Sequence, residues 1–210
     1  FTSSHQQGGI ANYASPTSSG QFFLDVYATE IQDGDAPSAT SASEFSIAYG
    51  HKAGSGSRDF TAGTGGTGFN ASKAVYNQYR QLVYGNSNRE FTFQGVTPDD
   101  IYVINFERAR IKQGLKPGSL NLTLKSGSSN FVYLTDDSVT STGSAVLTNL
   151  GRQFNLVTGS SGVMLGTDLT SQTVSGSFGF VYPDSGIIIF SHTCYCGTFS
   201  NLPGTKRLSC

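Results

Sequence analysis

The sequence predicts a mainly β domain of the β-rich α+β class. Antiparallel sheets and hairpins are expected to form a sandwich-like domain with one packed amphipathic helix near 71–84 and an extended N-terminal arm. Charged residues make up only 13% of the 210 residues, about half of the usual ~25%, whereas Gly is abundant at 26 residues. Short segments that alternate apolar and polar residues recur, and only one segment has a helical period.

The chain divides by composition into three parts. Residues 1–20 are mostly Ser, Gly, Gln and Thr, and they predict an extended arm or linker. Residues 21–192 carry the apolar segments and predict a single β-rich structural domain, while 193–210 form a C-terminal tail. Because the chain begins FTSSHQQGG and ends TKRLSC, we expect the natural polypeptide to be longer.

The first two strands are expected at 21–31 and 44–50. QFFLDVYATEI places Phe22, Leu24 and Val26 on one face, and EFSIAYG alternates in the same way. The long glycine-rich loop HKAGSGSRDFTAGTGGTG, 51–68, follows them. Loops of this length are usually functional or ordered at an interface.

The GTGGTG run at 63–68 matches the glycine spacing of a dinucleotide-binding loop. That motif must leave a buried strand before it enters a helix, whereas SGSRDFTA precedes this run, and Glu90 is only a loose match for a ribose carboxylate. We therefore interpret the segment as an assembly loop that orders, with the arm 1–20, against neighbouring proteins, and we expect no cofactor. The glycines assigned to this loop are Gly54, Gly56, Gly63, Gly65, Gly66 and Gly68.

A helix is expected at 71–84, capped at its start by Asn70 or Ser72 and closed by Gly85. Its core-facing stripe follows the i, i+4, i+7, i+8 spacing of one helix face. The stripe consists of Val75, Tyr79, Leu82 and Val83.

Strand patterns dominate after the helix. A turn at Lys116–Ser119 is expected to join a long strand at 99–114 to the alternating leucines of 120–124 as a hairpin. PDSG at 183–186 is expected to join the two halves of a second hairpin, 177–191. Further strands are expected at EFTFQG (90–95), FVYLTDDS and GRQFNLVTG.

His192, Cys194 and Cys196 would share one face of a strand, and with Cys210 they would make four zinc ligands. Structural zinc sites usually keep two or more residues between paired cysteines, and here there is one. A strand end without metal, and a Cys196–Cys210 disulfide, are the alternatives. We predict that no metal is required.

Other candidates for chemistry are weak. The acid pairs Asp33/Asp35, Asp99/Asp100 and Asp136/Asp137 lie in turn contexts, where Asp is favoured for hydrogen bonds to its own backbone. Arg108 and Arg110 are expected on one strand face, covering apolar surface with their stems. The net charge of −1 argues against direct nucleic-acid binding, and no apolar run approaches the ~20 residues of a membrane span.

Residues 44–191 resemble the virion structural proteins of contractile-tailed cyanophages and related marine phages. The resemblance rests on the order of its segments, since no single one is specific. They are FSIAYGHKAGSGS, SKAVYNQYRQLVYG, EFTFQG, DDIYVINFERARIKQGLKPGSLNLTLKSG, FVYLTDDS, GRQFNLVTGSSG and GFVYPDSGIIIFS. The HTCYCGTF…LSC ending departs from the family's pattern.

The resemblance implies a non-enzymatic tail or baseplate subunit, assembled in the host bacterial cytoplasm and placed in the virion by contacts with other virion proteins in a symmetric ring. The alternative is a receptor- or glycan-binding module of the tail tip. A tail-borne hydrolase using a carboxylate pair is a third hypothesis. Candidate tyrosines for a sugar platform are Tyr13, Tyr27, Tyr49, Tyr76, Tyr84 and Tyr195.

Overall fold

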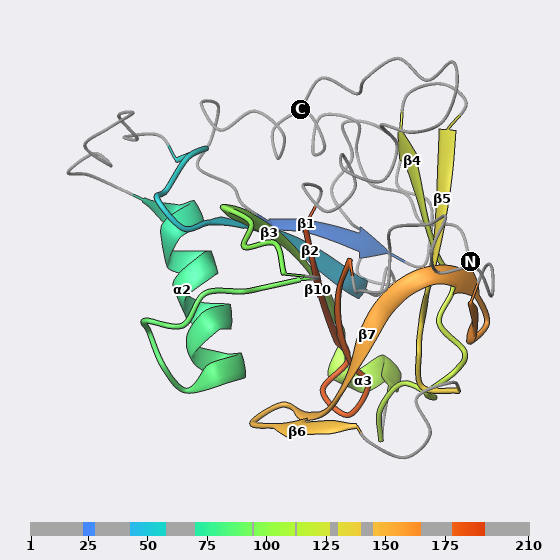
Figure 1. Ribbon diagram of the computed structural model, residues 1–210. Helices are drawn as coiled ribbons and strands as arrows, with labels where there is room; N and C mark the ends of the chain where they lie inside the picture. The colour runs from blue at the N-terminus through green and yellow to red at the C-terminus, as the bar shows by residue number, and fades with distance from the viewer. Residues whose placement is uncertain are drawn as a thin grey trace.

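The computed structural model describes residues 23–27, 43–57, 70–93, 95–111, 113–126, 130–139, 145–164 and 178–191. Figure 1 shows how its elements are arranged. They are β1 (Phe23–Tyr27), β2 (Ser43–His51), α2 (Ala71–Tyr84), β3 (Asp100–Phe106), α3 (Arg108–Ile111), β4 (Leu122–Ser126), β5 (Asn130–Asp136), β6 (Val146–Thr148), β7 (Gly151–Ser160), β8 (Val163–Met164), β9 (Gly179–Tyr182) and β10 (Ile187–Phe190).

All strand pairs in the described ranges are antiparallel, and the strands form one continuous curled sheet. Its order is β1-β2-β3-β10-β9-β7-β5-β4, and the short strands β6 and β8 each pair with β7. The mainly β class with one packed amphipathic helix is therefore confirmed. The two layers expected of a sandwich are supplied by the curl of this single sheet.

The curl gives the sheet an inner and an outer face. Phe106 on β3, Val181 on β9 and Asp136 on β5 lie on the same face by register, and they line one cavity although other strands separate them. That face is therefore the inner one. The opposite face carries Ile101, Val103 and Ile189, each fully buried.

Helix α2 covers the outer face. Tyr76 and Tyr79 are 0% and 6% exposed, and Val75 and Val83 are also buried. Gly50 on β2 allows the close approach, because a Cβ atom there would lie 2.8 Å from the backbone nitrogen of Tyr76. Gly85 ends the helix in the left-handed conformation, and its amide donates to the carbonyl of Gln81.

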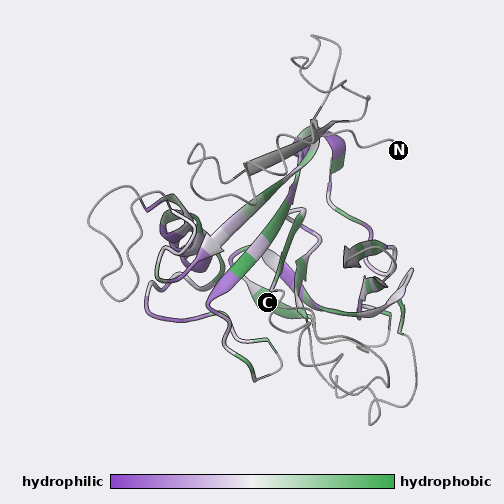
Figure 2. Ribbon diagram, turned by 90° about the horizontal axis from the view of Figure 1, so that it is seen from above, coloured by the Kyte–Doolittle hydropathy of each residue, from purple (hydrophilic) through white to green (hydrophobic). Residues whose placement is uncertain are grey.

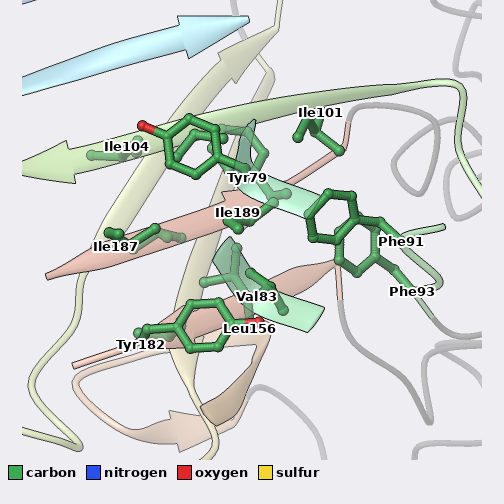
Figure 3. Packing of buried hydrophobic residues seen from close by; sticks show 14 of the residues in the cluster. Tyr79, Val83, Phe91, Phe93, Ile101, Ile104, Leu156, Tyr182, Ile187 and Ile189 are labelled. Carbon is green, nitrogen blue, oxygen red and sulfur yellow. The ribbon is translucent and has the colours of Figure 1, made fainter. Parts of the chain in front are cut away.

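The core is continuous from the helix into the sheet. Figure 3 shows Tyr79, Val83, Phe91 and Phe93 gathered around Ile189. Phe91 packs edge-on against Tyr76, with ring centroids 5.5 Å apart. In Figure 2 the central strands carry long hydrophobic stretches, while α2 shows hydrophilic residues as well.

The predicted helical stripe is wrong at one position. Leu82 is 41% exposed, whereas Tyr76, which was left out of the stripe, is completely buried. Asn70 stands at the N-cap without a side-chain capping bond. The hydroxyl of Ser57 instead accepts the backbone amide of Ser72 at 3.1 Å, so the cap comes from the preceding loop.

The long strand predicted at 99–114 is also wrong beyond Phe106. The pairing of β3 ends there, since Phe106 is its last residue with a partner on β2 and Asn105 is its last residue with a partner on β10. The chain turns into α3, where the carbonyl of Glu107 accepts the amides of Arg110 and Ile111. Arg108 and Arg110 are therefore exposed helical residues rather than neighbours on a strand face.

Two further strand predictions need correction. The leucine strand β4 pairs with β5, not with β3, so the Lys116–Ser119 turn joins elements that are not partners. Among the described residues of segment 90–95, the β pairing is an isolated bridge of Phe93 with Val96. The second predicted hairpin is confirmed, because β9 and β10 pair around residues 183–186.

Candidate functional site

Two exposed valines stand close to the turns at 116–120 and 160–162. Val139 follows β5 and Val163 begins β8, and they are 63% and 69% exposed. Beneath Val139 lie two glycines of positive φ, Gly118 and Gly162; a Cβ on either would lie within 2.7 Å of its Cγ2 atom. We call Val139, Val163 and the turns at 116–120 and 160–162 the valine surface.

A buried carboxylate fixes the first of these turns. Asp136, 2% exposed, accepts hydrogen bonds from the backbone amides of Gly118 at 2.6 Å and Leu120 at 3.3 Å. It also accepts a short hydrogen bond from the hydroxyl of Ser138. Bonds to an ionised acceptor are stronger than neutral ones, so the turn is held firmly to the end of β5.

Asn121 fixes the second turn. Its side-chain oxygen accepts the amide of Ser161 and the hydroxyl of Ser160, both at 2.8 Å, and its nitrogen donates to the hydroxyl of Ser161 at 2.9 Å. The amide of Gly162 donates to Thr135 at 2.7 Å. The valine surface is therefore built on rigid loops.

A cavity of about 210 Å³ adjoins the valine surface on the inner face of the sheet. Most of its lining is apolar, with Lys116 and Asp136 among the exceptions. The lining residues are Phe106, Leu115, Lys116, Pro117, Ser119, Leu120, Asn121, Asp136, Val181 and Pro183.

A larger groove of about 450 Å³ lies where the C-terminal end of α2 comes close to β6, at the lower left of Figure 1. Val83 and Phe180 are among its apolar residues. Its polar residues include four with planar side-chain groups, which are Arg89, Glu90, Asn149 and Gln153. The full lining is Val83, Tyr84, Arg89, Glu90, Thr92, Val146, Leu147, Thr148, Asn149, Gln153 and Phe180.

Two contacts orient polar groups of this groove. The hydroxyl of Tyr182, which is 0% exposed, donates to Oε1 of Gln153 at 3.0 Å. Burial raises the pKa of Tyr182 far above its ordinary value, so this hydroxyl remains a donor. The guanidinium of Arg89 stacks on the ring of Tyr84, 4.4 Å from its centroid.

A polar cluster lies at the end of β2 and β3, where His51 is opposite Asp100. Burial lowers the pKa of His51, although the carboxylates of Asp100 and Asp99 oppose that shift. The hydroxyl of Ser191 donates to Asp100 at 3.2 Å.

The two acid pairs that the structure describes, Asp99/Asp100 and Asp136/Asp137, contact other segments of the chain. Asp99 pairs with Lys52 at 2.6 Å, and Glu90 lies 3.9 Å from the same ammonium group. Asp137 accepts the backbone amide and side-chain nitrogen of Asn155, at 2.9 and 2.8 Å. The carboxylates at 136 and 137 thus bond other segments, and Asp136 also accepts from Ser138 in its own turn.

The predicted assembly loop is only partly described. Gly54 and Gly56 adopt positive φ, and Ser57 and Ser55 both bond Ser72 of α2. This first part of the loop is therefore held by its own chain. Gly63, Gly65, Gly66 and Gly68, the arm 1–20, the pair Asp33/Asp35, and His192, Cys194, Cys196 and Cys210 lie outside the described residues.

Among the residues that the structure places, no group of three or more His, Cys, Asp or Glu side chains could hold a metal ion. No helix in the same part of the chain is long and apolar enough to cross a membrane. No family model, no curated protein and no solved structure matches the chain.

Sequence reasoning missed the valine surface. Val139 and Val163 stand in polar, turn-rich segments, where isolated valines are unremarkable. The sequence held one signal for this surface, which was Asp136 directly after the apolar segment FVYLT. A carboxylate buried at the end of such a strand needs hydrogen-bond donors from a neighbouring segment.

Proposed function

We propose that this chain is a structural subunit of a tailed-phage virion, located in the tail or baseplate, that acts through protein–protein contacts without catalysis. The single observation that carries the proposal is the valine surface. Two largely exposed valines stand on loops that hydrogen bonds already hold in place.

The energetics favour a docking role for this surface. Fully burying a valine contributes roughly 1.5–3 kcal/mol, and most of that gain is lost while Val139 and Val163 are 63% and 69% exposed. A rigid surface loses little conformational entropy on binding, so more of the gain remains as affinity. The adjoining apolar cavity offers space for a partner's side chain.

Composition and resemblance support the same function. Charged residues are depleted in the cores of protein–protein interfaces, and they make up only 13% of this chain. This composition suits a protein that remains in contact with its neighbours. The ordered segments of residues 44–191 resemble tail proteins of contractile-tailed phages. Partners are other virion proteins, repeated symmetrically around the tail, and the location is the virion after assembly in the bacterial cytoplasm.

The test is incorporation into particles. We expect purified virions to contain the chain, and Val139→Asp and Val163→Asp to lower its copy number per particle by about tenfold or more, since each costs at least ~1.4 kcal/mol of docking energy. Val96→Asp is the matched control, because Val96 is 45% exposed in a different turn. Equal incorporation of all three variants, or absence of the chain from virions, would contradict the proposal.

A further inference from the structure

We propose that the groove between α2 and β6 binds a neutral oligosaccharide. This binding site is separate from the valine surface, and its argument does not depend on assembly. Of the tyrosines considered as sugar platforms, Tyr76 is completely buried, whereas Tyr84 lines the groove.

The size and lining of the groove fit a small ligand. Its volume of about 450 Å³ falls within the roughly 300–1,000 Å³ typical of ligand sites. Phe180, which is half-buried, provides apolar contact for the C–H faces of a sugar ring. Leu147, 79% exposed on β6, extends that apolar contact to the rim.

The polar groups match hydroxyls. A sugar hydroxyl both donates and accepts, so its site needs both kinds of partner. Arg89 supplies only donors, Glu90 only acceptors, and Asn149 and Gln153 supply both. Planar groups of this kind bond two adjacent hydroxyls at once, as they bond carboxylates in a bidentate manner.

The charge of the groove favours a neutral ligand. Arg89 and Glu90 are the charged residues of the lining, and their formal charges sum to zero. The ammonium of Lys52, 3.9 Å from Glu90, is balanced by Asp99 at 2.6 Å. A phosphate or carboxylate ligand would be repelled by Glu90 and would need a surplus of cations. The ligand class is therefore an uncharged polyol.

The groove is organised before a ligand arrives. Because Tyr182 donates to Oε1 of Gln153, the amide nitrogen of Gln153 is left to donate elsewhere. Arg89 is held against Tyr84, which restricts a side chain that is otherwise mobile. Asn149 lies beside Gly85, since a Cβ there would be 3.2 Å from its side-chain nitrogen.

A peptide fits the groove less well. An extended peptide binds through the backbone groups of a strand edge. Here the polar groups are side chains from the loop after α2, from the β6–β7 turn and from β7, and they converge on one space. Convergent side chains suit a compact ligand.

The test is calorimetry and saturation-transfer NMR with maltotriose, a galactotriose and a mannotriose. We expect at least one to bind with a dissociation constant of about 1 mM or lower. Arg89→Ala and Glu90→Gln should each weaken that binding about tenfold without changing the melting temperature. Lys73→Ala, which removes an exposed cation at the opposite end of α2, should leave it unchanged.

Three results would overturn the proposal. They are no binding of any trisaccharide up to about 10 mM, binding that neither groove variant weakens, and binding of an uncharged Ser/Gly-rich peptide in place of the sugars. None of these results bears on incorporation into virions, so the two proposals fail independently.

Discussion

The backbone amide of Gly118 donates to the carboxylate of Asp136 at 2.6 Å, and this bond links residues 18 apart in sequence. It brings the turn at 116–120 against the end of β5. Since Val139 packs over Gly118, the same bond positions one half of the valine surface.

We expect Asp136→Ala to destabilise the protein by about 3 kcal/mol, because two backbone donors and one hydroxyl lose a buried acceptor. Urea unfolding measures the change in the free energy of unfolding. Ser138→Ala removes only one of the three donors and should cost about 1 kcal/mol. Equal losses in the two variants would show that the carboxylate does not organise the turn.

Tyr79 and Leu82 lie on the same helix and should respond differently to truncation. Tyr79→Ala should cost roughly 3–5 kcal/mol, because the ring is 6% exposed in the core. Leu82→Ala should cost less than about 1 kcal/mol, since this side chain is 41% exposed. Thermal or urea unfolding compares them, and a larger loss for Leu82→Ala would refute the packing of α2.

Gly50 tests the contact between α2 and the sheet. We expect Gly50→Ala to destabilise the protein by about 1–3 kcal/mol, because its Cβ would lie 2.8 Å from the backbone nitrogen of Tyr76. Ala48→Gly, two residues earlier on the same face, removes a methyl without a clash and serves as a control. A stabilised Gly50→Ala variant would place the helix farther from β2.

His51 predicts a dependence of stability on pH. Its folded pKa lies below its ordinary value of 6.5 because of burial, so the unfolded chain binds a proton at higher pH than the folded chain. The contribution of His51 to the free energy of unfolding is fully present above its ordinary pKa. This contribution is lost as the pH falls from the ordinary pKa to the folded pKa.

We therefore expect His51→Gln to flatten the loss of stability between about pH 7 and pH 5. The measurement is the free energy of unfolding of both proteins across that range. His5 and His192 are common to both chains, so their contributions cancel in the difference. A steeper decline in the variant would reverse the sign assigned to His51.

The elements predicted correctly from sequence are those with a local signal. The helix was recognisable because apolar residues recur at helical spacing and Gly85 follows its last turn. The β9–β10 hairpin was recognisable because its turn, PDSG, lies directly between its two strands.

The errors arise where distant segments decide the structure. Nothing near 108–111 in sequence shows that β3 loses its β10 partner after Asn105 and its β2 partner after Phe106. Nothing near 120–124 shows that its partner is β5. The assignment of Leu82 and Tyr76 depends on how α2 is rotated against Gly50, which periodicity fixes only to within about one residue.

The candidate sites were harder to predict than the fold. The turns of the valine surface are held by hydrogen bonds of Asp136, Asn121 and Gly162. In the groove, Gln153 is oriented by its hydrogen bond with Tyr182. Each set joins segments far apart in sequence. Among the groove residues, Tyr84 was considered as a sugar contact by its type alone, and Glu90 was considered only as a loose match for a ribose carboxylate.

Site-specific photo-crosslinking in assembled particles tests most directly whether the valine surface docks on neighbouring virion proteins. A photoreactive amino acid at position 163 should yield a crosslink to another virion chain, whereas the same group at position 96 should yield little, since Val96 lies in a different turn. Abundant crosslinking from 163 with little from 96 is the predicted result. Crosslinks from 96 but none from 163 would contradict the assembly role of the valine surface.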